Sequence, residues 1–157
     1  MAKGSSKFGK YKERKVREAL RNPINVLKSL GEKSQEKTYK YQRLYRNLYN
    51  PEFYLLAYQN IYANKGSMTP GVDGMTIDGI SMARINRITQ SMRNQSYQPK
   101  PARREYIKKK TGSKKRPLGI SSADDKLVQE VVRMILESIY EGGFSTKSHG
   151  FRPNRSC

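Results

Sequence analysis

A periodic run of apolar residues in the last third of the sequence constrains the fold more than any other feature. Its spacing of three and four residues predicts an amphipathic helix that begins at about Asp124 and ends at Gly142-Gly143. The apolar positions are Leu127, Val128, Val131, Val132, Ile135 and Ile139. The charged residues expected on the solvent side are Lys126, Glu130, Arg133 and Glu137. We interpret Asp124 and Asp125 as helix caps, because acidic side chains favour the positive helix end, and we assign them no metal.

A basic β-hairpin is predicted immediately before that helix. Thr111-Gly112-Ser113 is a turn signal between two short segments with strand character. The stretch from Lys100 to Arg116 contains nine Lys or Arg and one Glu, a local charge of +8. Crowded like charges cost free energy, so a polyanion is the expected partner, and a solvated surface turn is the alternative. We expect Tyr106-Ile107 and Leu118-Ile120 to pin the hairpin to a core.

Composition narrows the class of protein. The chain has 157 residues and a net charge of +19, which indicates a nucleic-acid partner more than an anionic membrane surface. No apolar run approaches the ~20 residues that a membrane span needs, and no signal-peptide core is present, so we expect no membrane partner and an intracellular, cytoplasmic location. Cys157 is the single cysteine and His149 the single histidine. We therefore predict no metal site and no cofactor in this chain.

Residues 1–49 are predicted to form a basic helical extension that binds RNA. Met1 to Arg46 contains 14 Lys or Arg and four Glu, a local charge of +10. One helix is expected over Lys10 to Leu30, interrupted near Asn22-Pro23, and another over Gln35 to Tyr49. The second would carry three tyrosines on one face: Tyr41, Tyr45 and Tyr49. Packing on a neighbouring element and stacking on bases are both open interpretations of that face.

Two further helices and a glycine-rich loop are predicted between this extension and the hairpin. Asn50-Pro51-Glu52 is a helix-start signal for a helix that extends to about Asn64. Its expected apolar face is Tyr54, Leu55, Tyr58, Ile61 and Tyr62. The other helix covers Ile80 to Asn94, with Ser81 as its candidate cap. The loop from Lys65 to Gly74 holds three glycines and a proline, so it could approach a ligand closely, form a lid or simply connect two helices.

Four segments of the sequence, in this order, carry a family resemblance. They are YQNIYANKGSMTPGVDG (58–74), RPLGI (116–120), ADDKLVQEVVRMILESIYE (123–141) and SHGFRPNRSC (148–157). Together they resemble the start of a group II intron-encoded reverse transcriptase, the intron maturase, over about Tyr39 to Cys157. The resemblance implies an α+β fold, mostly helical with a small antiparallel hairpin. It also implies that residues 50–157 are part of the polymerase fingers, with palm and thumb absent.

The resemblance implies binding roles for particular residues and no catalytic residue. Lys110 and Arg116 match the pair that closes over the incoming nucleotide. The residues implied in template or RNA binding are Lys65, Gly66, Gly71, Lys108, Lys109, Lys114, Lys115, Gly150, Phe151, Arg152 and Arg155. Those implied in binding the intron RNA are Lys10, Lys12, Arg14, Lys15, Arg17, Arg21, Lys40, Arg43 and Arg46. For the turn that carries Arg152 and Arg155, ordinary solvent exposure is the alternative.

The resemblance also implies a parent enzyme, expected in a bacterium. That enzyme would copy an RNA template from a DNA primer into DNA, using Mg²⁺ and deoxynucleotides. It would also bind group II intron RNA in a ribonucleoprotein and assist splicing and mobility. The chain alone, without the palm aspartates, is expected to be inactive. The alternatives are a non-catalytic basic RNA-binding protein and the fingers of another bacterial retroelement polymerase, such as a retron.

Overall fold

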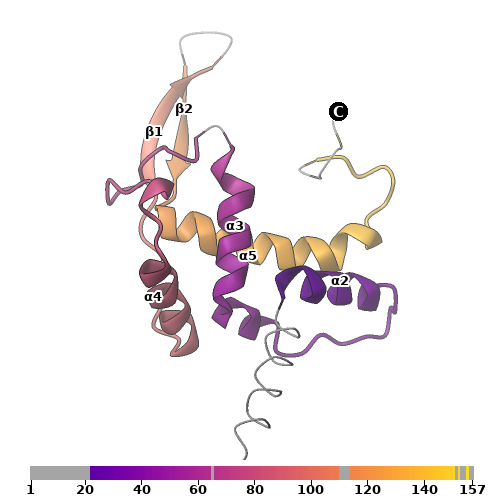
Figure 1. Cartoon of the computed structure of the whole chain (residues 1–157). Coiled ribbons are helices and arrows are strands. Elements are labelled where there is room, and N and C mark those ends of the chain that lie inside the picture. The colour runs from indigo at the N-terminus through magenta and orange to yellow at the C-terminus, as the bar shows by residue number, and fades with distance from the viewer. Residues whose placement is uncertain (1–21, 65, 110–113, 151, 153–154, 156–157) are drawn as a thin grey trace, which may run out of the picture. The chain divides into compact units, whose positions relative to one another are not determined.

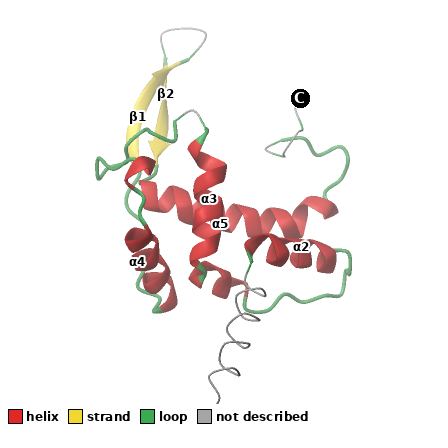
Figure 2. Cartoon of the chain, in the orientation of Figure 1, coloured by secondary structure: helices red, strands yellow, loops and turns green. Residues whose placement is uncertain are grey.

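The computed structural model describes residues 22–64, 66–109, 114–150, 152 and 155. Within these ranges about half of the residues are helical and one antiparallel two-stranded sheet forms, which confirms the predicted α+β class (Figures 1 and 2). Its contacts define two compact units: residues 42–133, and residues 1–41 together with 134–157. The predicted division between residues 49 and 50 stays a prediction. No described helix is both long and apolar enough to cross a bilayer.

Helix α3, Pro51–Tyr62, begins where the sequence predicts. The Asn50 side chain accepts a hydrogen bond from the Glu52 backbone N–H at 3.1 Å, and Pro51 occupies the first helical position, where no N–H is needed. The predicted apolar face is partly wrong, since Tyr62 is 51% exposed. The fully buried side chains are Phe53, Tyr54 and Ala57. Their burial shifts the core-facing stripe toward the N-terminal half of the helix.

Helix α4, Met82–Arg93, follows a short 3₁₀ turn, η2, Ile77–Gly79. Ser81 caps it as predicted, because its Oγ accepts a hydrogen bond from the Arg84 N–H at 3.2 Å. Ile85, Ile88 and Met92, which follow one another at spacings of three and four residues, are buried. Arg84 is buried as well, which its charge gave no reason to expect.

Strands β1, Arg103–Lys108, and β2, Lys115–Ile120, form the predicted hairpin, whose turn lies outside the described residues. The antiparallel register pairs Arg103 with Ile120 at the base and Lys108 with Lys115 at the far end. The expectation that apolar residues pin both strands to a core is wrong for most of the hairpin. Tyr106 is 57% and Leu118 46% exposed, whereas Ile120 at the base is buried.

Helix α5, Ala123–Tyr140, is the predicted long amphipathic helix, and it passes from the first unit into the second. Leu127 and Val131 are fully buried, as the periodicity predicts. The helix cap is Ser122 and not an aspartate: Ser122 Oγ accepts from the Asp125 N–H at 3.2 Å and donates to Asp125 Oδ2 at 2.7 Å. Glu130, expected on the solvent side, is buried and accepts a hydrogen bond from the Asn60 amide at 3.0 Å.

In the second unit, α2 covers Pro23–Ser34 and η3 covers Glu141–Gly143. Asn22 Oδ1 caps α2 by accepting from the Ile24 N–H at 2.9 Å, so the expected interruption at Asn22-Pro23 is a helix start. The helix extends four residues beyond Leu30, where we expected it to end. The preceding stretch, Lys10 to Arg21, lies outside the described residues.

The predicted helix over Gln35 to Tyr49 is wrong, because only the 3₁₀ helix η1, Leu44–Tyr49, forms there. Tyr41 donates its hydroxyl to the Leu30 carbonyl at 3.0 Å, which turns the chain back along α2. Arg43 then adopts φ 56°, a left-handed conformation that no α-helix contains. The Tyr45 and Tyr49 rings lie 5.6 Å apart in η1, and the Tyr45 hydroxyl donates to the Met92 carbonyl, so both tyrosines make contacts inside the protein while Tyr45 stays 45% exposed.

Candidate nucleic-acid interface

Four lysines are gathered at the far end of the hairpin. Lys108 lies directly opposite Lys115, and the Lys109 N–H donates to the Lys114 carbonyl at 3.2 Å, which continues the ladder by one pair. All four are exposed. Like charges placed directly opposite one another destabilise a sheet, so a bound polyanion would relieve a real cost here.

Lys110 and Arg116 are the two residues predicted to hold a nucleotide. The distance between them is not described, because Lys110 lies outside the described residues. Arg116 is exposed and pairs with Ile107 in the ladder. Alternate residues of a strand point to opposite faces, so Arg116 shares its face with Lys109 and Lys114. The assignment of Lys110 and Arg116 to the nucleotide stays a prediction, and Lys109 and Lys114 are the described lysines nearest to Arg116 on that face.

The glycine-rich loop is held to α5 by Lys126. The Lys126 ammonium donates to the carbonyls of Gly66 at 3.2 Å, Ser67 at 3.2 Å and Thr69 at 2.7 Å. Removal of this ammonium from water lowers the pKa of Lys126. The sequence placed Lys126 on the solvent side of the helix and missed this role, because the partners lie 57 to 60 residues away.

Residues of the hairpin and of the segment just before it contact the C-terminal half of the same loop. Arg103 Nε donates to the Pro70 carbonyl at 3.1 Å, and Lys100 Nζ pairs with Asp73 Oδ2 at 2.7 Å. The hydrogen bond from Lys100 lowers the pKa of the Asp73 carboxyl. Gly71 is buried so tightly that an added Cβ would lie 2.6 Å from the Ser122 Cα. The loop is therefore anchored at both ends and is no free lid.

Two of the predicted loop residues bear on this interface in different ways. Gly66 is exposed and has φ 91°, a conformation that favours glycine. Lys65 lies outside the described residues. Template binding by Gly66 and Gly71 stays a prediction. The close packing of Gly71 against Ser122 already explains why a glycine stands at position 71.

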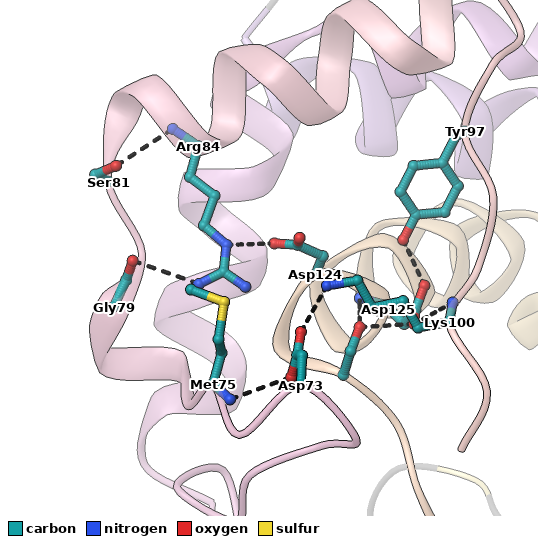
Figure 3. Close-up of polar contacts among 10 residues, drawn as sticks. Asp73, Met75, Gly79, Ser81, Arg84, Tyr97, Lys100, Asp124 and Asp125 are labelled. Carbon is teal, nitrogen blue, oxygen red and sulfur yellow. Dashed lines mark hydrogen bonds and ion pairs between the residues drawn. The ribbon is translucent and has the colours of Figure 1, made fainter. Parts of the chain in front are cut away.

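A polar network joins α4 and the segment before β1 to the start of α5 (Figure 3). Arg84 points from α4 to Asp124, and their Nε and Oδ1 atoms lie 2.6 Å apart. The Asp125 carboxylate accepts from the Tyr97 hydroxyl at 2.5 Å, the Lys100 N–H at 3.1 Å and the Ser122 hydroxyl. The pKa of Tyr97 is raised, chiefly by burial of its hydroxyl and next by the hydrogen bond to Asp125. Both carboxylates are thus engaged by protein donors.

These aspartates do not fit a Mg²⁺ site. An ion would have to compete with the Arg84 guanidinium for Asp124 and with three donors for Asp125. Within the described ranges no group of three or more His, Cys, Asp or Glu is placed to hold a metal.

In the C-terminal segment, the Arg152 guanidinium bonds to other groups of the protein. Its Nε and Nη2 donate to Glu141 Oε1 at 3.0 and 2.7 Å, and its Nη1 donates to the carbonyls of Ser145 and Ser148. The guanidinium also lies 5.1 Å from the centre of the Phe144 ring. The hydrogen bond from Arg152 lowers the pKa of Glu141. Contact of Arg152 with template stays a prediction, and it would require these bonds to break.

Of the other residues predicted to bind RNA near the two ends of the chain, the structure describes only some. Gly150 and Arg155 are exposed, as are Lys40, Arg43 and Arg46 in the first part of the chain. The predicted binding residues that lie outside the described ranges are Lys10, Lys12, Arg14, Lys15, Arg17, Arg21 and Phe151.

Comparison of the sequence with known proteins finds clear relatives, although no family model matches the sequence. The chain is 51% identical over 139 residues to the group II intron-encoded protein LtrA of Lactococcus lactis subsp. cremoris, which covers 88% of this chain and 23% of LtrA. It is 44% identical over 142 residues to a 91 kDa protein in the cob intron of Schizosaccharomyces pombe, covering 87% and 17%. It is 42% identical over 103 residues to a putative COX1/OXI3 intron 2 protein of Saccharomyces cerevisiae, covering 66% and 12%.

An α+β chain with a strongly basic hairpin is thus similar in sequence to intron-encoded proteins from bacteria and fungi. The chain belongs to the group II intron-encoded reverse transcriptase/maturase family. It spans about a quarter or less of the length of these relatives.

Proposed function

We propose that this chain is the N-terminal extension and fingers part of a group II intron reverse transcriptase/maturase, and that it binds RNA. The observation that carries the proposal is the 51% identity to LtrA over 88% of the chain. The four-lysine end of the hairpin supports it, because four exposed cations lie together there, and Arg103 at the hairpin base bonds to the anchored loop. Phosphate contacts by such cations would give affinity without sequence preference.

In the proposed parent enzyme, the chain contributes binding and charge. The hairpin would hold template and nucleotide through its cations, and the hairpin and the basic extension would both contact phosphates of the intron RNA. Charge stabilisation of a transferring phosphoryl group is largely a matter of position, which a hairpin anchored at its base can provide. Mg²⁺ would neutralise triphosphate charge in that enzyme, and its ligands would belong to segments other than the described ones.

The experiment that tests the proposal is intron-RNA binding by the whole chain across a salt series. Changing Lys108, Lys109, Lys114 and Lys115 to Gln should reduce the slope of log K against log salt by about 3, because each lost phosphate contact removes roughly 0.7 to 0.9. The control changes exposed cations that lie outside both the hairpin and residues 1–49 to Gln: Arg87, Arg93 and Lys147. Equal losses in both variants would attribute binding to net charge and contradict a hairpin site.

A further inference from the structure

The strand alternation divides the hairpin into two faces with different surroundings. On one face Arg103 bonds to the Pro70 carbonyl and Ile120 is buried, so its base is packed against the protein. The other face, which we call the open face, is exposed at all of its six positions. These positions are Arg104, Tyr106 and Lys108 on β1 and Lys115, Pro117 and Gly119 on β2.

Tyr106 stands at the centre of the open face. It is 57% exposed and lies opposite Pro117 in the ladder. Arg104 and Lys108 flank it at two residues' distance on either side, roughly 7 Å along the strand. Within the described part of the chain, the ring packs on no other aromatic ring and the hydroxyl has no hydrogen-bond partner. An aromatic surface is therefore presented to solvent between two cations.

The charges of the open face point to an anionic ligand. The face holds three cations and no acid, and its Lys108–Lys115 pair places two ammonium groups directly across the ladder. Such a pair is destabilising in the absence of a counter-charge. Arg104 is exposed and lies opposite Gly119, so no side chain stands directly across the ladder from it.

We propose that the open face binds single-stranded RNA, with one unpaired base stacked on the Tyr106 ring. Adjacent phosphates would be held by Arg104, Lys108 and Lys115. An aromatic ring beside cations suits a single strand, because a base offers a free π-face only when it is unpaired. The inference rests on the proposed RNA binding and deepens it. It adds a ligand-binding role for Tyr106, which the sequence predicted only as a core contact, and it places single-stranded RNA on the face of the hairpin opposite Arg116.

A fluorescence titration of the whole chain tests the stacking directly. The sequence contains no tryptophan, so Tyr106→Trp introduces the only indole. A short oligouridylate should quench its emission, and a blunt RNA duplex at equal phosphate concentration should not. Equal quenching by both would overturn base stacking at this face.

Affinity measurements on the same chain supply the second arm. Tyr106→Ala should weaken binding of the single strand about 5- to 150-fold while the salt slope stays unchanged, because no phosphate contact is removed. Tyr106→Phe should keep the affinity. Tyr140→Ala is the matched control, since Tyr140 is 58% exposed and lies outside the hairpin, and it should have no effect.

The possible failures are distinguishable. If the chain binds neither intron RNA nor the single strand at roughly 50 mM salt, the proposed function fails and this inference fails with it. If RNA binds but Tyr106→Ala binds the single strand as tightly as the unchanged chain, only this inference is overturned. If polyglutamate displaces the single strand and Tyr106→Ala changes nothing, the open face fits an acidic protein, which also overturns it.

Discussion

Lys126 Nζ lies 2.7 Å from the Thr69 carbonyl oxygen, and this contact joins α5 to the glycine-rich loop. Lys126→Met keeps the aliphatic stem and removes the charge. We expect it to lower the free energy of unfolding by about 1.5–3 kcal/mol, as the loss of hydrogen bonds to a charged group does. Hydrogen exchange of the loop amides should accelerate more than that of α3. Lys147→Met, at an exposed lysine, is the control; equal effects would show that Lys126 does not anchor the loop.

Gly71 and Ser122 make the second contact that shapes this loop. Gly71→Ala places a methyl group where an added Cβ is only 2.6 Å from the Ser122 Cα, so the backbone must shift. We expect a loss of about 1–3 kcal/mol in chemical denaturation, the usual cost of overpacking. Gly143→Ala is the control, because nothing lies within 4 Å of its added Cβ. A neutral Gly71→Ala would contradict the close approach.

The loop and the helix starts were predictable from the sequence, because both depend on residues that are close together in the chain. Asn50, Pro51 and Ser81 cap or begin helices through neighbours two or three residues away. Lys126 and Arg84 escaped detection, because their partners lie 40 or more residues away and a local pattern shows only a charge on a helix.

The failed helix at Gln35 to Tyr49 has a related cause. Tyrosines at four-residue spacing fit a helix, but the Tyr41 hydroxyl bonds to Leu30, and Arg43 turns the backbone left-handed. Weak helix propensity yields to such tertiary contacts. The hairpin cations were predictable as a charge cluster, whereas their division between two faces depends on a register that only the structure supplies.

The Arg84–Asp124 ion pair should matter more than a helix cap. Its side chains are 7% and 23% exposed, so Asp124→Ala leaves a buried guanidinium without its counter-charge. We expect a loss of about 3–5 kcal/mol, compared with 0.5–2 kcal/mol for a lost cap. Denaturant titration measures it, with Asp78→Ala, at an exposed aspartate, as control. If Arg84→Met with Asp124→Leu does not recover part of the stability, the pair is not the cause.

The Lys100–Asp73 pair should make the loop anchor sensitive to acid. Because its hydrogen bond lowers the Asp73 pKa in the folded state, the pair stabilises the fold fully above the unfolded pKa of about 3.9. That stability is lost as the pH falls through the lower folded pKa. Urea titrations between about pH 5 and pH 2 should therefore show a shallower acid loss in Asp73→Asn than in the unchanged chain. Identical pH profiles would refute the pairing.

Arg116 should act on nucleotides in the proposed parent enzyme. We expect Arg116→Ala to lower kcat/KM for deoxynucleotides by roughly 10²-fold, about 3 kcal/mol, with intron-RNA affinity retained. Arg116→Lys should rescue only partly, because an ammonium lacks the planar fork of the guanidinium. Unchanged nucleotide kinetics with lost RNA affinity would make Arg116 a phosphate anchor instead.

The central claim is that the hairpin is where this chain meets RNA. Amide hydrogen exchange of the whole chain, with and without a group II intron RNA at low salt, tests it most directly. We predict that RNA protects the amides of Arg103–Lys108 and, apart from Pro117, of Lys115–Ile120, and that the four-glutamine hairpin variant loses this protection. Protection that is absent from both strands while the RNA is bound would contradict the account.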